Sequence, residues 1–273
     1  LQFVHGSGPA GRITHEDLDV YLASRGQPAA IGAARGLRQR QGEEAVPIMG
    51  LRRRIAQKMQ EAKRRIPHFS YVEEVDVTEL EALRLQLNAR FAGSRGKLTL
   101  LPFILRAVVR AIDDFPQVNA RFDDDAGIVT RFSPVHLGVA TQTDAGLMVP
   151  VLRHAESQDL WGLSAEVARL ADAARSGKAA RDELSGSTIT VTSLGALGGI
   201  ATTPVVNHPE VAIVGVNRVV ERPMFSASGA VVARKLMNLS SSFDHRVVDG
   251  MDAARFIQAV RSLLEQPAFL FVE

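Results

Sequence analysis

The stretch Phe243-Asp244-His245-Arg246-Val247-Val248-Asp249-Gly250 joins a strand-like run to a helix-like run near the end of the chain. We therefore expect His245 to lie on a turn between two rigid elements, which fixes a side chain while leaving it accessible. Asp249 follows four positions later, and Gly250 offers a permissive backbone where the helix begins. A histidine can take a proton from a thiol or hydroxyl and return it to a leaving group. His245 is thus a candidate general base, although a histidine near a carboxylate can also be purely structural.

A second run supplies hydroxyl groups. Acyl transfer places negative charge on the attacked carbonyl oxygen, which needs a hydrogen-bond donor. The run from Thr188 to Gly195 reads as a strand that ends in a glycine-rich turn, and the period of two puts Thr188, Thr190 and Thr192 on one face. Thr192 lies at the strand end, where its hydroxyl could donate. Threonine also favours strands for packing reasons, so the pattern alone leaves both interpretations open.

Composition excludes several classes of site and protein. The 273 residues are 46% hydrophobic and include no cysteine, so disulfides, cysteine zinc sites and a cysteine nucleophile are excluded. The lack of disulfides fits a reducing compartment, and we expect a bacterial cytoplasmic protein rather than one of the mitochondrial matrix. No apolar run reaches the roughly 18 residues of a membrane span, so no membrane partner is expected. Leu1 is not an initiator methionine, which suggests a piece of a longer chain.

The net charge is only +2, but basic residues gather between positions 35 and 65. We interpret this stretch as a solvated linker that leads into an amphipathic helix. An anionic ligand such as a nucleotide-bearing cofactor is the alternative, and nucleic acid ranks last because no aromatic residues interleave with the charges.

Three regions follow from the pattern along the chain. Residues 1–25 read as a small, truncated helical unit in which Thr14 and Asp17 form a capping pair, and residues 26–45 read as a mobile linker. Residues 46–273 mix strands and helices, which predicts one α/β or α+β domain. Its expected strands cover 69–77, 135–140, 147–152, 188–193, 211–217 and 231–242. One expected helix ends before Pro67, a second starts at a Thr78 cap, and a third runs from Pro102 to before Phe115. Two further expected helices span 157–175 and 252–265.

Two rival chemistries lack their motifs. A serine hydrolase would carry a Gly-x-Ser-x-Gly elbow, which is absent. His245 and Asp249 could share a helical face as metal ligands, but the β-branched Val247-Val248 favours a turn, and the other histidines form no ligand motif. We therefore expect no metal.

Taken together, the motifs resemble those of dihydrolipoamide acyltransferases, the core components of 2-oxoacid dehydrogenase complexes. The segment 244–250 resembles the active-site signature of that family, and similar motifs stand in the family's order over 46–273. These are Ile66-Pro67-His68-Phe69, Lys97-Leu98-Thr99 with Pro102-Phe103, Phe115-Pro116-Gln117-Val118-Asn119-Ala120, Gly146-Leu147-Met148-Val149-Pro150-Val151, Thr190-Val191-Thr192-Ser193-Leu194-Gly195 and Pro209-Glu210-Val211-Ala212-Ile213. Residues 3–25 resemble the second half of the family's peripheral subunit-binding domain, with its first helix missing.

The resemblance implies a fold like chloramphenicol acetyltransferase, a mixed sheet flanked by helices, as the trimeric building block of a cage. It implies transfer of an acyl group from a dihydrolipoyl arm, carried on an upstream domain absent here, to coenzyme A in a channel between two subunits. The partners implied are further copies of the chain and, through the subunit-binding domain, the 2-oxoacid decarboxylase component and dihydrolipoamide dehydrogenase.

Roles for individual residues also follow from the resemblance. His245 would be the general base. Thr192 would donate a hydrogen bond to the oxyanion, in a site whose His245 comes from a neighbouring subunit, with Ser193 as the adjacent alternative. Asp249 would be a group near the catalytic histidine whose charge is not essential. The candidates for contact with coenzyme A are Arg84, His68 and Lys97, although Arg84 could also be a solvated helix arginine.

The acyl group and the activity itself leave alternatives. The segments 66–71, 73–76 and 265–270 resemble the branched-chain version most, with the acetyl-transferring pyruvate dehydrogenase version as the near alternative. An inactive structural core subunit is a further alternative, but His245 and Thr192 are both present. The tether-like residues 1–45 argue against a free acetyltransferase acting on a small hydroxyl acceptor.

Overall fold

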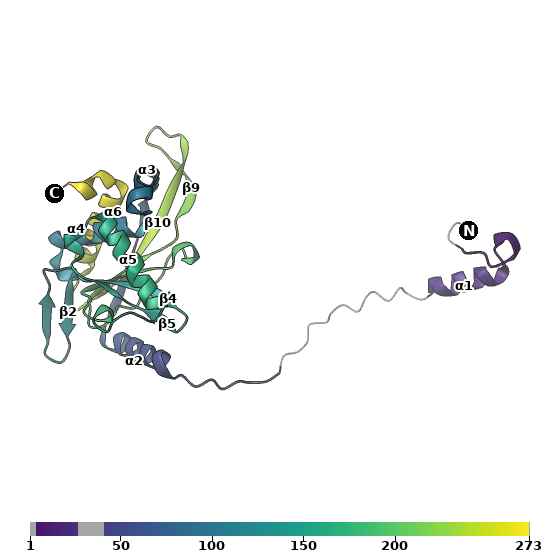
Figure 1. Cartoon of the computed structure of the whole chain (residues 1–273), viewed down its shortest axis with the longest axis horizontal. Helices are drawn as coiled ribbons and strands as arrows, with labels where there is room; N and C mark the ends of the chain where they lie inside the picture. Colours follow the sequence, from purple (N-terminus) through teal and green to yellow (C-terminus); the bar gives the residue numbers. More distant parts are fainter. Residues whose placement is uncertain (1–3, 27–40, 273) are drawn as a thin grey trace. The chain divides into compact units, whose positions relative to one another are not determined.

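The computed structural model describes residues 4–26 and 41–272, which form two compact units, Leu1–Pro47 and Ile48–Glu273 (Figure 1). In the first unit a short 3₁₀ turn (Pro9–Gly11) precedes helix α1 (His15–Gly26). Thr14 and Asp17 form the expected reciprocal cap: the Thr14 N–H donates to Asp17 Oδ2 at 2.8 Å and the Asp17 N–H donates to Thr14 Oγ1 at 3.3 Å. Most of the predicted linker, residues 27–40, lies outside the described residues.

The second unit is built on one mixed sheet with the order β1-β10-β8-β7-β4-β5. β6 also pairs with β4, and β9 pairs with β10; the β4–β7 and β7–β8 pairs are parallel and the others antiparallel. The strands are β1 (His68–Asp76), β4 (Leu137–Thr143), β5 (Gly146–Met148), β6 (Val151–Leu152), β7 (Ile189–Ser193), β8 (Ala212–Val216), β9 (Val220–Phe225) and β10 (Val231–Asp244). The expected mixed sheet flanked by helices is confirmed.

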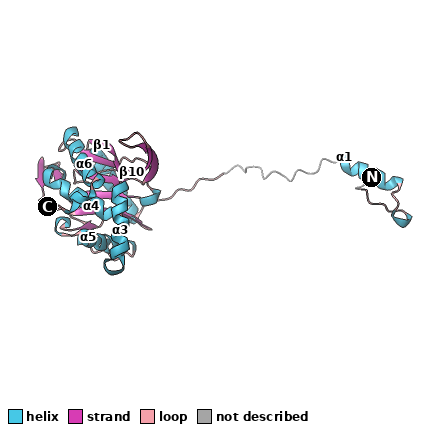
Figure 2. Cartoon of the chain, turned by 90° about the horizontal axis from the view of Figure 1, so that it is seen from above, coloured by secondary structure: helices cyan, strands magenta, loops and turns pink. Residues whose placement is uncertain are grey.

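Four helices cover one face of this sheet (Figure 2). They are α3 (Thr78–Arg95), α4 (Leu101–Asp114), α5 (Leu160–Arg175) and α6 (Gly250–Glu265). α4 lies between α5 and α6 and is apolar nearly all round, with Phe103, Leu105 and Val108 fully buried. Burying each such side chain contributes roughly 1.5–3 kcal/mol, so α4 fixes the other helices on the sheet.

Alternation along β10 separates the two faces of the sheet. Met237, Leu239 and Phe243 point into the core beneath the helices, whereas Ser240 and Ser242 lie on the other face. Helix α2 (Gly50–Arg65) reaches this second face, where Ala62 and Ile66 pack with Val206 and Ile213. The second face is thus partly polar and is covered by α2 and the segment around residue 206.

Some element boundaries differ from the prediction. The expected strand 147–152 is divided into β5 and β6 because Pro150 interrupts pairing. Thr78 is the first residue of α3 rather than its cap: its N–H and hydroxyl both donate to Asp76 Oδ1. The backbone of Gly250 does not have a positive φ, so the permissiveness of glycine is not needed there; Asp249 is the residue before the first helical turn.

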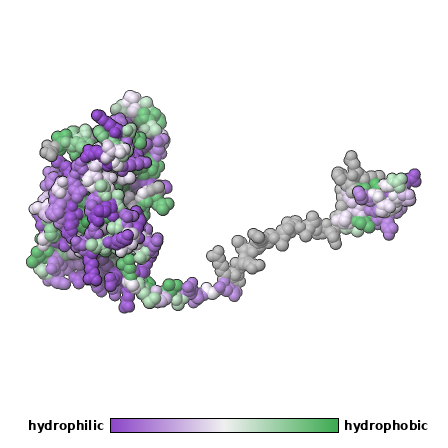
Figure 3. All heavy atoms as spheres, in the orientation of Figure 1, coloured by the Kyte–Doolittle hydropathy of each residue, from purple (hydrophilic) through white to green (hydrophobic). Residues whose placement is uncertain are grey.

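Two hairpins had not been predicted. β2 (Ala120–Asp123) pairs with β3 (Ile128–Arg131) in a separate two-stranded sheet, and β9 pairs with the first half of β10. Met224, Phe225 and Val231 near the tip of the β9–β10 hairpin are exposed, and apolar surface gathers there (Figure 3). Exposed apolar residues at such a tip hide the period-two pattern that marks a strand.

Candidate functional site

His245 lies where the sequence predicted, on the turn between β10 and α6. Its backbone N–H donates to the carbonyl oxygen of Pro67 at 3.3 Å, and its ring lies over Phe69 with the centroids 4.4 Å apart. The side chain is 50% exposed, so a substrate can reach it. Asp249 is 82% exposed and its Oδ1 is 3.9 Å from His245 Nδ1, which is too far for a hydrogen bond.

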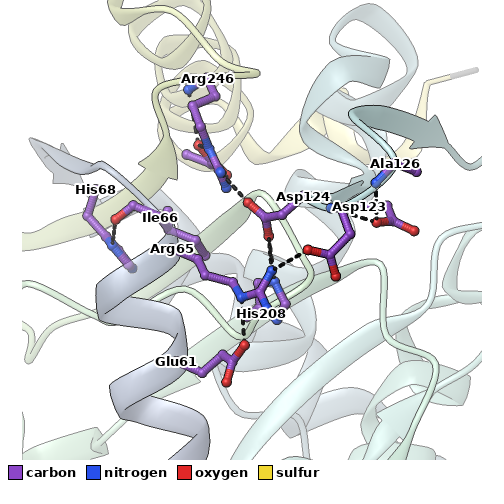
Figure 4. Close-up of polar contacts among 11 residues, drawn as sticks. Glu61, Arg65, Ile66, His68, Asp123, Asp124, Ala126, His208 and Arg246 are labelled. Atoms are coloured by element: carbon purple, nitrogen blue, oxygen red, sulfur yellow. Dashed lines mark hydrogen bonds and ion pairs between the residues drawn. The ribbon is translucent and has the colours of Figure 1, made fainter.

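Arg246 ties this turn together. The buried carboxylate of Asp244 accepts hydrogen bonds from the Arg246 N–H at 3.0 Å and from its guanidinium at 2.6 and 2.9 Å. Arg246 also binds Asp124, on the β2–β3 hairpin (Figure 4). The hydrogen bonds that Arg246 donates to Asp244 raise the pKa of Arg246 further above its usual value, so the guanidinium stays charged. Arg246 lies within the turn motif recognised from the sequence, whereas Asp124 was not singled out.

A pocket of about 660 Å³ brings together Arg84 (α3), Lys97 and Ser193 (β7). Apolar side chains, among them Leu101, make up much of the remaining lining. Arg84 donates to both carboxylate oxygens of Glu81, at 2.9 and 2.7 Å, and this pairing raises its pKa. Two of the three residues predicted to contact a cofactor therefore share one cavity with one of the two hydroxyl candidates.

The two hydroxyl candidates line neighbouring cavities, which share Val216 and Asn217 in their lining. Thr192, half-buried at the end of β7, lines a smaller cavity of about 150 Å³ with Thr202 and Asn217. Its hydroxyl makes no hydrogen bond to any residue that the structure describes, whereas Ser193 Oγ accepts from the Gly195 N–H at 3.2 Å. Both hydroxyl protons are therefore free to donate among the described residues, and Thr192 differs only in that its lone pairs are unused as well.

His68 does not join Arg84 and Lys97 in the larger pocket. It begins β1 opposite Asp244, and its Nε2 accepts from the Val206 N–H at 3.0 Å. That contact fixes the proton on Nδ1, which donates to the Ile66 carbonyl oxygen at 2.9 Å. Burial lowers the pKa of His68, so the ring is neutral and anchors the segment around Val206.

Within one chain, His245 and Thr192 lie at opposite ends of the sheet. The register places Asp244 beside Val211 and Thr192 beside Gly215, on either side of β8. Four residues along β8 and two strand spacings across it separate the backbones by about 16 Å. One carbonyl group cannot contact both side chains across that distance, so a single chain does not assemble the predicted pair.

A fully buried carboxyl group, Glu210, lies just before β8 and was not singled out from the sequence as a functional residue. Ser187, Thr190 and Asn207 hydrogen-bond to it, the last two at 2.6 Å. Burial raises its pKa against these hydrogen bonds. Its contacts tie β7 to the segment before β8, and they place it in the framework of the sheet.

Within residues 4–26 and 41–272, no group of three or more histidine, aspartate or glutamate side chains is placed to hold a metal ion. Over the same residues no helix is long and apolar enough to cross a membrane.

The chain is similar to a known catalytic domain over most of its length. Residues 40–272 match the family model described as 2-oxoacid dehydrogenases acyltransferase (catalytic domain). The lipoamide acyltransferase component of the branched-chain alpha-keto acid dehydrogenase complex of Pseudomonas aeruginosa is 72% identical over all of this chain, which spans 64% of that relative. The acetyltransferase component of a Staphylococcus epidermidis pyruvate dehydrogenase complex is 35% identical over all of this chain and 67% of that relative.

Solved structures agree with this similarity. The cubic core of a pyruvate dehydrogenase complex is 38% identical with a TM-score of 0.80, covering 85% of this chain and 95% of that one. Azotobacter vinelandii dihydrolipoamide acetyltransferase is 37% identical with the same TM-score and coverage; its study concerns the role of a serine, a histidine and an asparagine in the catalytic mechanism. There the histidine stands 52 positions after the serine and four before the asparagine. Chloramphenicol acetyltransferase, 16% identical with a TM-score of 0.50 over 76% of this chain and 94% of that one, shares the fold.

Proposed function

Because the chain belongs to the 2-oxoacid dehydrogenase acyltransferase family, we propose that its catalytic domain, residues 46–273, moves an acyl group from a dihydrolipoyl group to coenzyme A. We assign a branched-chain acyl group, since the branched-chain relative is 72% identical and the acetyl-transferring one 35% identical. The acetyl-transferring version is the second candidate. The lipoyl group would be supplied by a domain outside this chain.

The observation that carries the proposal is the placement of His245, half exposed on a turn held by Pro67, Asp244 and Arg246. In this account His245 takes the proton of the coenzyme A thiol. Between an ordinary thiol and an ordinary imidazole this transfer is uphill by about 2 pKa units, or about 2.7 kcal/mol. Positioning of the thiol beside the ring in a channel that excludes water offsets that cost.

The thiolate then attacks the thioester carbonyl, and the resulting oxyanion accepts a hydrogen bond from Thr192. Collapse of the tetrahedral intermediate breaks the bond to the dihydrolipoyl sulfur, which receives the proton from His245. No acyl-enzyme forms, consistent with the absence of a nucleophile elbow. The hydroxyl of Thr192, which makes no hydrogen bond to a described residue, supports it as the donor. Ser193 is the alternative, because its hydroxyl only accepts from the Gly195 N–H and because it stands 52 positions before His245, the spacing of the A. vinelandii serine.

Within one chain the backbones at the His245 turn and at Thr192 are about 16 Å apart, which supports a site shared between two copies of the chain. We assign His245 from one copy and Thr192 from its neighbour, in trimers that build a larger cage. The cubic core formed by the 38% identical relative supports such an assembly.

The pocket that holds Arg84 and Lys97 is the site we assign to coenzyme A. Its apolar lining suits the pantetheine arm, and the two cations suit the phosphates. Glu81 already pairs with Arg84, so Lys97 is the less committed of the two cations. His68 remains a candidate for the channel only through its place beside the His245 turn.

We interpret residues 1–25 as part of a peripheral subunit-binding domain, with 26–45 as the linker. On that interpretation the decarboxylase component and dihydrolipoamide dehydrogenase bind there. Because similar relatives are Pseudomonas proteins, we also assign the complex to a bacterium, with the cytoplasm as its location.

Acyl transfer between coenzyme A and free dihydrolipoamide tests this function. Isobutyryl, isovaleryl and acetyl donors would be compared, with His245→Ala as the control. We expect branched donors to react fastest and the variant to lose activity. An acetyl preference would reassign the complex, and no transfer by the assembled wild-type protein would leave only a structural core role.

A further inference from the structure

The His245 ring has few contacts of its own, so its direction depends on the backbone of the turn. Phe69 supports one side of the ring, and Asp249 is too far away to hold Nδ1. The turn itself depends on the fork between Arg246 and the buried Asp244. Any group that fixes the Arg246 guanidinium therefore fixes the place from which the base acts.

Asp124 is that group in the structure. It belongs to the β2–β3 hairpin, 121 positions before His245 in the sequence, and its side chain is only 13% exposed. One carboxylate oxygen accepts from Arg246, and the other accepts from His208 Nε2 at 3.0 Å (Figure 4). Arg65, the last residue of α2, lies 3.7 Å from the same oxygen as His208.

The surrounding charges favour an ionised carboxylate at Asp124. Burial alone would raise its pKa, but the hydrogen bonds and charges of Arg246 and His208 outweigh burial, and the pKa is lowered. The Arg246 guanidinium also stacks on Phe122, with its central carbon 4.5 Å from the ring centroid. The guanidinium is thus held by two carboxylates and one ring, a set that few side-chain rotations satisfy.

We propose that Asp124 is a positioning residue for His245, which it orients through Arg246 by joining the β2–β3 hairpin to the β10–α6 turn. This inference rests on the proposed role of His245 as the base. It assigns to Asp124 on the hairpin a function that acts through Arg246 rather than on the substrate itself.

The test is steady-state acyl transfer by assembled Asp124→Asn protein, with Asp125→Asn as the matched control. Asp125 is the next residue, is 88% exposed and pairs only with Arg65 among the described residues. We expect Asp124→Asn to lower kcat about 10- to 100-fold while KM for coenzyme A stays within about twofold, because a base displaced by about 1 Å loses rate rather than binding. Asp125→Asn should match the wild type, and Asp124→Glu, which keeps the carboxylate, should recover at least about a third of kcat.

The proposal is overturned if Asp124→Asn keeps kcat within twofold, or if kcat falls only together with the thermal midpoint and Asp124→Glu brings no recovery. Should Asp124→Asn fail to assemble, Arg246→Lys serves in its place: it keeps the charge but loses the fork, and the same fall in kcat at constant KM is expected. Unchanged kcat in Arg246→Lys would overturn the proposal as well. Inactive wild-type and Asp125→Asn proteins would instead refute the proposed function.

Discussion

Thr192→Val removes one hydroxyl and keeps the shape of the side chain. In the structure this hydroxyl makes no hydrogen bond to a described residue, so its loss leaves no partner unsatisfied and we expect the free energy of unfolding to change by less than about 0.5 kcal/mol. Removal of an oxyanion donor costs about 2.7–4 kcal/mol of transition-state stabilisation, which lowers kcat about 10²- to 10³-fold. Activity and stability therefore separate cleanly in this variant.

The assay is acyl transfer to coenzyme A with a branched-chain dihydrolipoamide thioester, together with thermal unfolding of the same samples. Thr192→Ser should keep most of the activity, and Ser193→Ala, which alters the neighbouring side chain in a different cavity, should keep kcat within about threefold. A large loss in Ser193→Ala with normal Thr192→Val activity would transfer the role to Ser193. Normal kcat in both variants would refute the oxyanion assignment.

Three other substitutions give separate expectations. Lys97→Ala should raise KM for coenzyme A about three- to tenfold with little change in kcat. The exposed lysine would contact only the phosphates, and such a contact contributes about 1 kcal/mol of binding free energy. An unchanged KM would place the coenzyme A site elsewhere. Asp249→Asn should keep kcat within about threefold in the same assay, because the carboxylate is exposed and 3.9 Å from the ring; a hundredfold loss would show that its charge matters. Glu210 has a raised pKa in the folded state. Above about pH 4.3, the pKa of an unfolded glutamate, the folded protein still holds this proton while the unfolded chain loses it. The free energy of unfolding should therefore fall as the pH rises from about 4.3 to the folded pKa. Denaturant unfolding from pH 4 to 8 should show this decline in the wild type and a flatter profile in Glu210→Gln; identical slopes would contradict the assignment.

Much of the fold could be predicted because its signals are local. The period of β10, the apolar face of α5 and the breaks at Pro67 and Pro116 all act within a few residues. The turn that carries His245 was predicted for the same reason. A single strand was predicted over 147–152, and its division at Pro150 into two short strands depends on pairing with β4.

The contacts that hold the site could not be predicted, because they join segments far apart in the sequence. Asp124 stands in a run of three aspartates whose composition indicates only an exposed turn, yet it binds Arg246 and His208. His68 was expected near a cofactor, and its two ring nitrogens are instead satisfied by backbone groups. Pairing across such distances depends on the tertiary fold, and no local pattern contains it.

Mixing two inactive variants tests the central claim most directly. His245→Ala and Thr192→Val chains would be unfolded together in equal amounts, refolded and assayed for acyl transfer, with each variant refolded alone as the control. If each site takes His245 from one copy and Thr192 from its neighbour, random assembly gives an intact pair at a quarter of the sites, and about a quarter of wild-type activity should return. If each chain supplied both groups to its own site, no intact site could form, and the mixture would be no more active than the two variants alone.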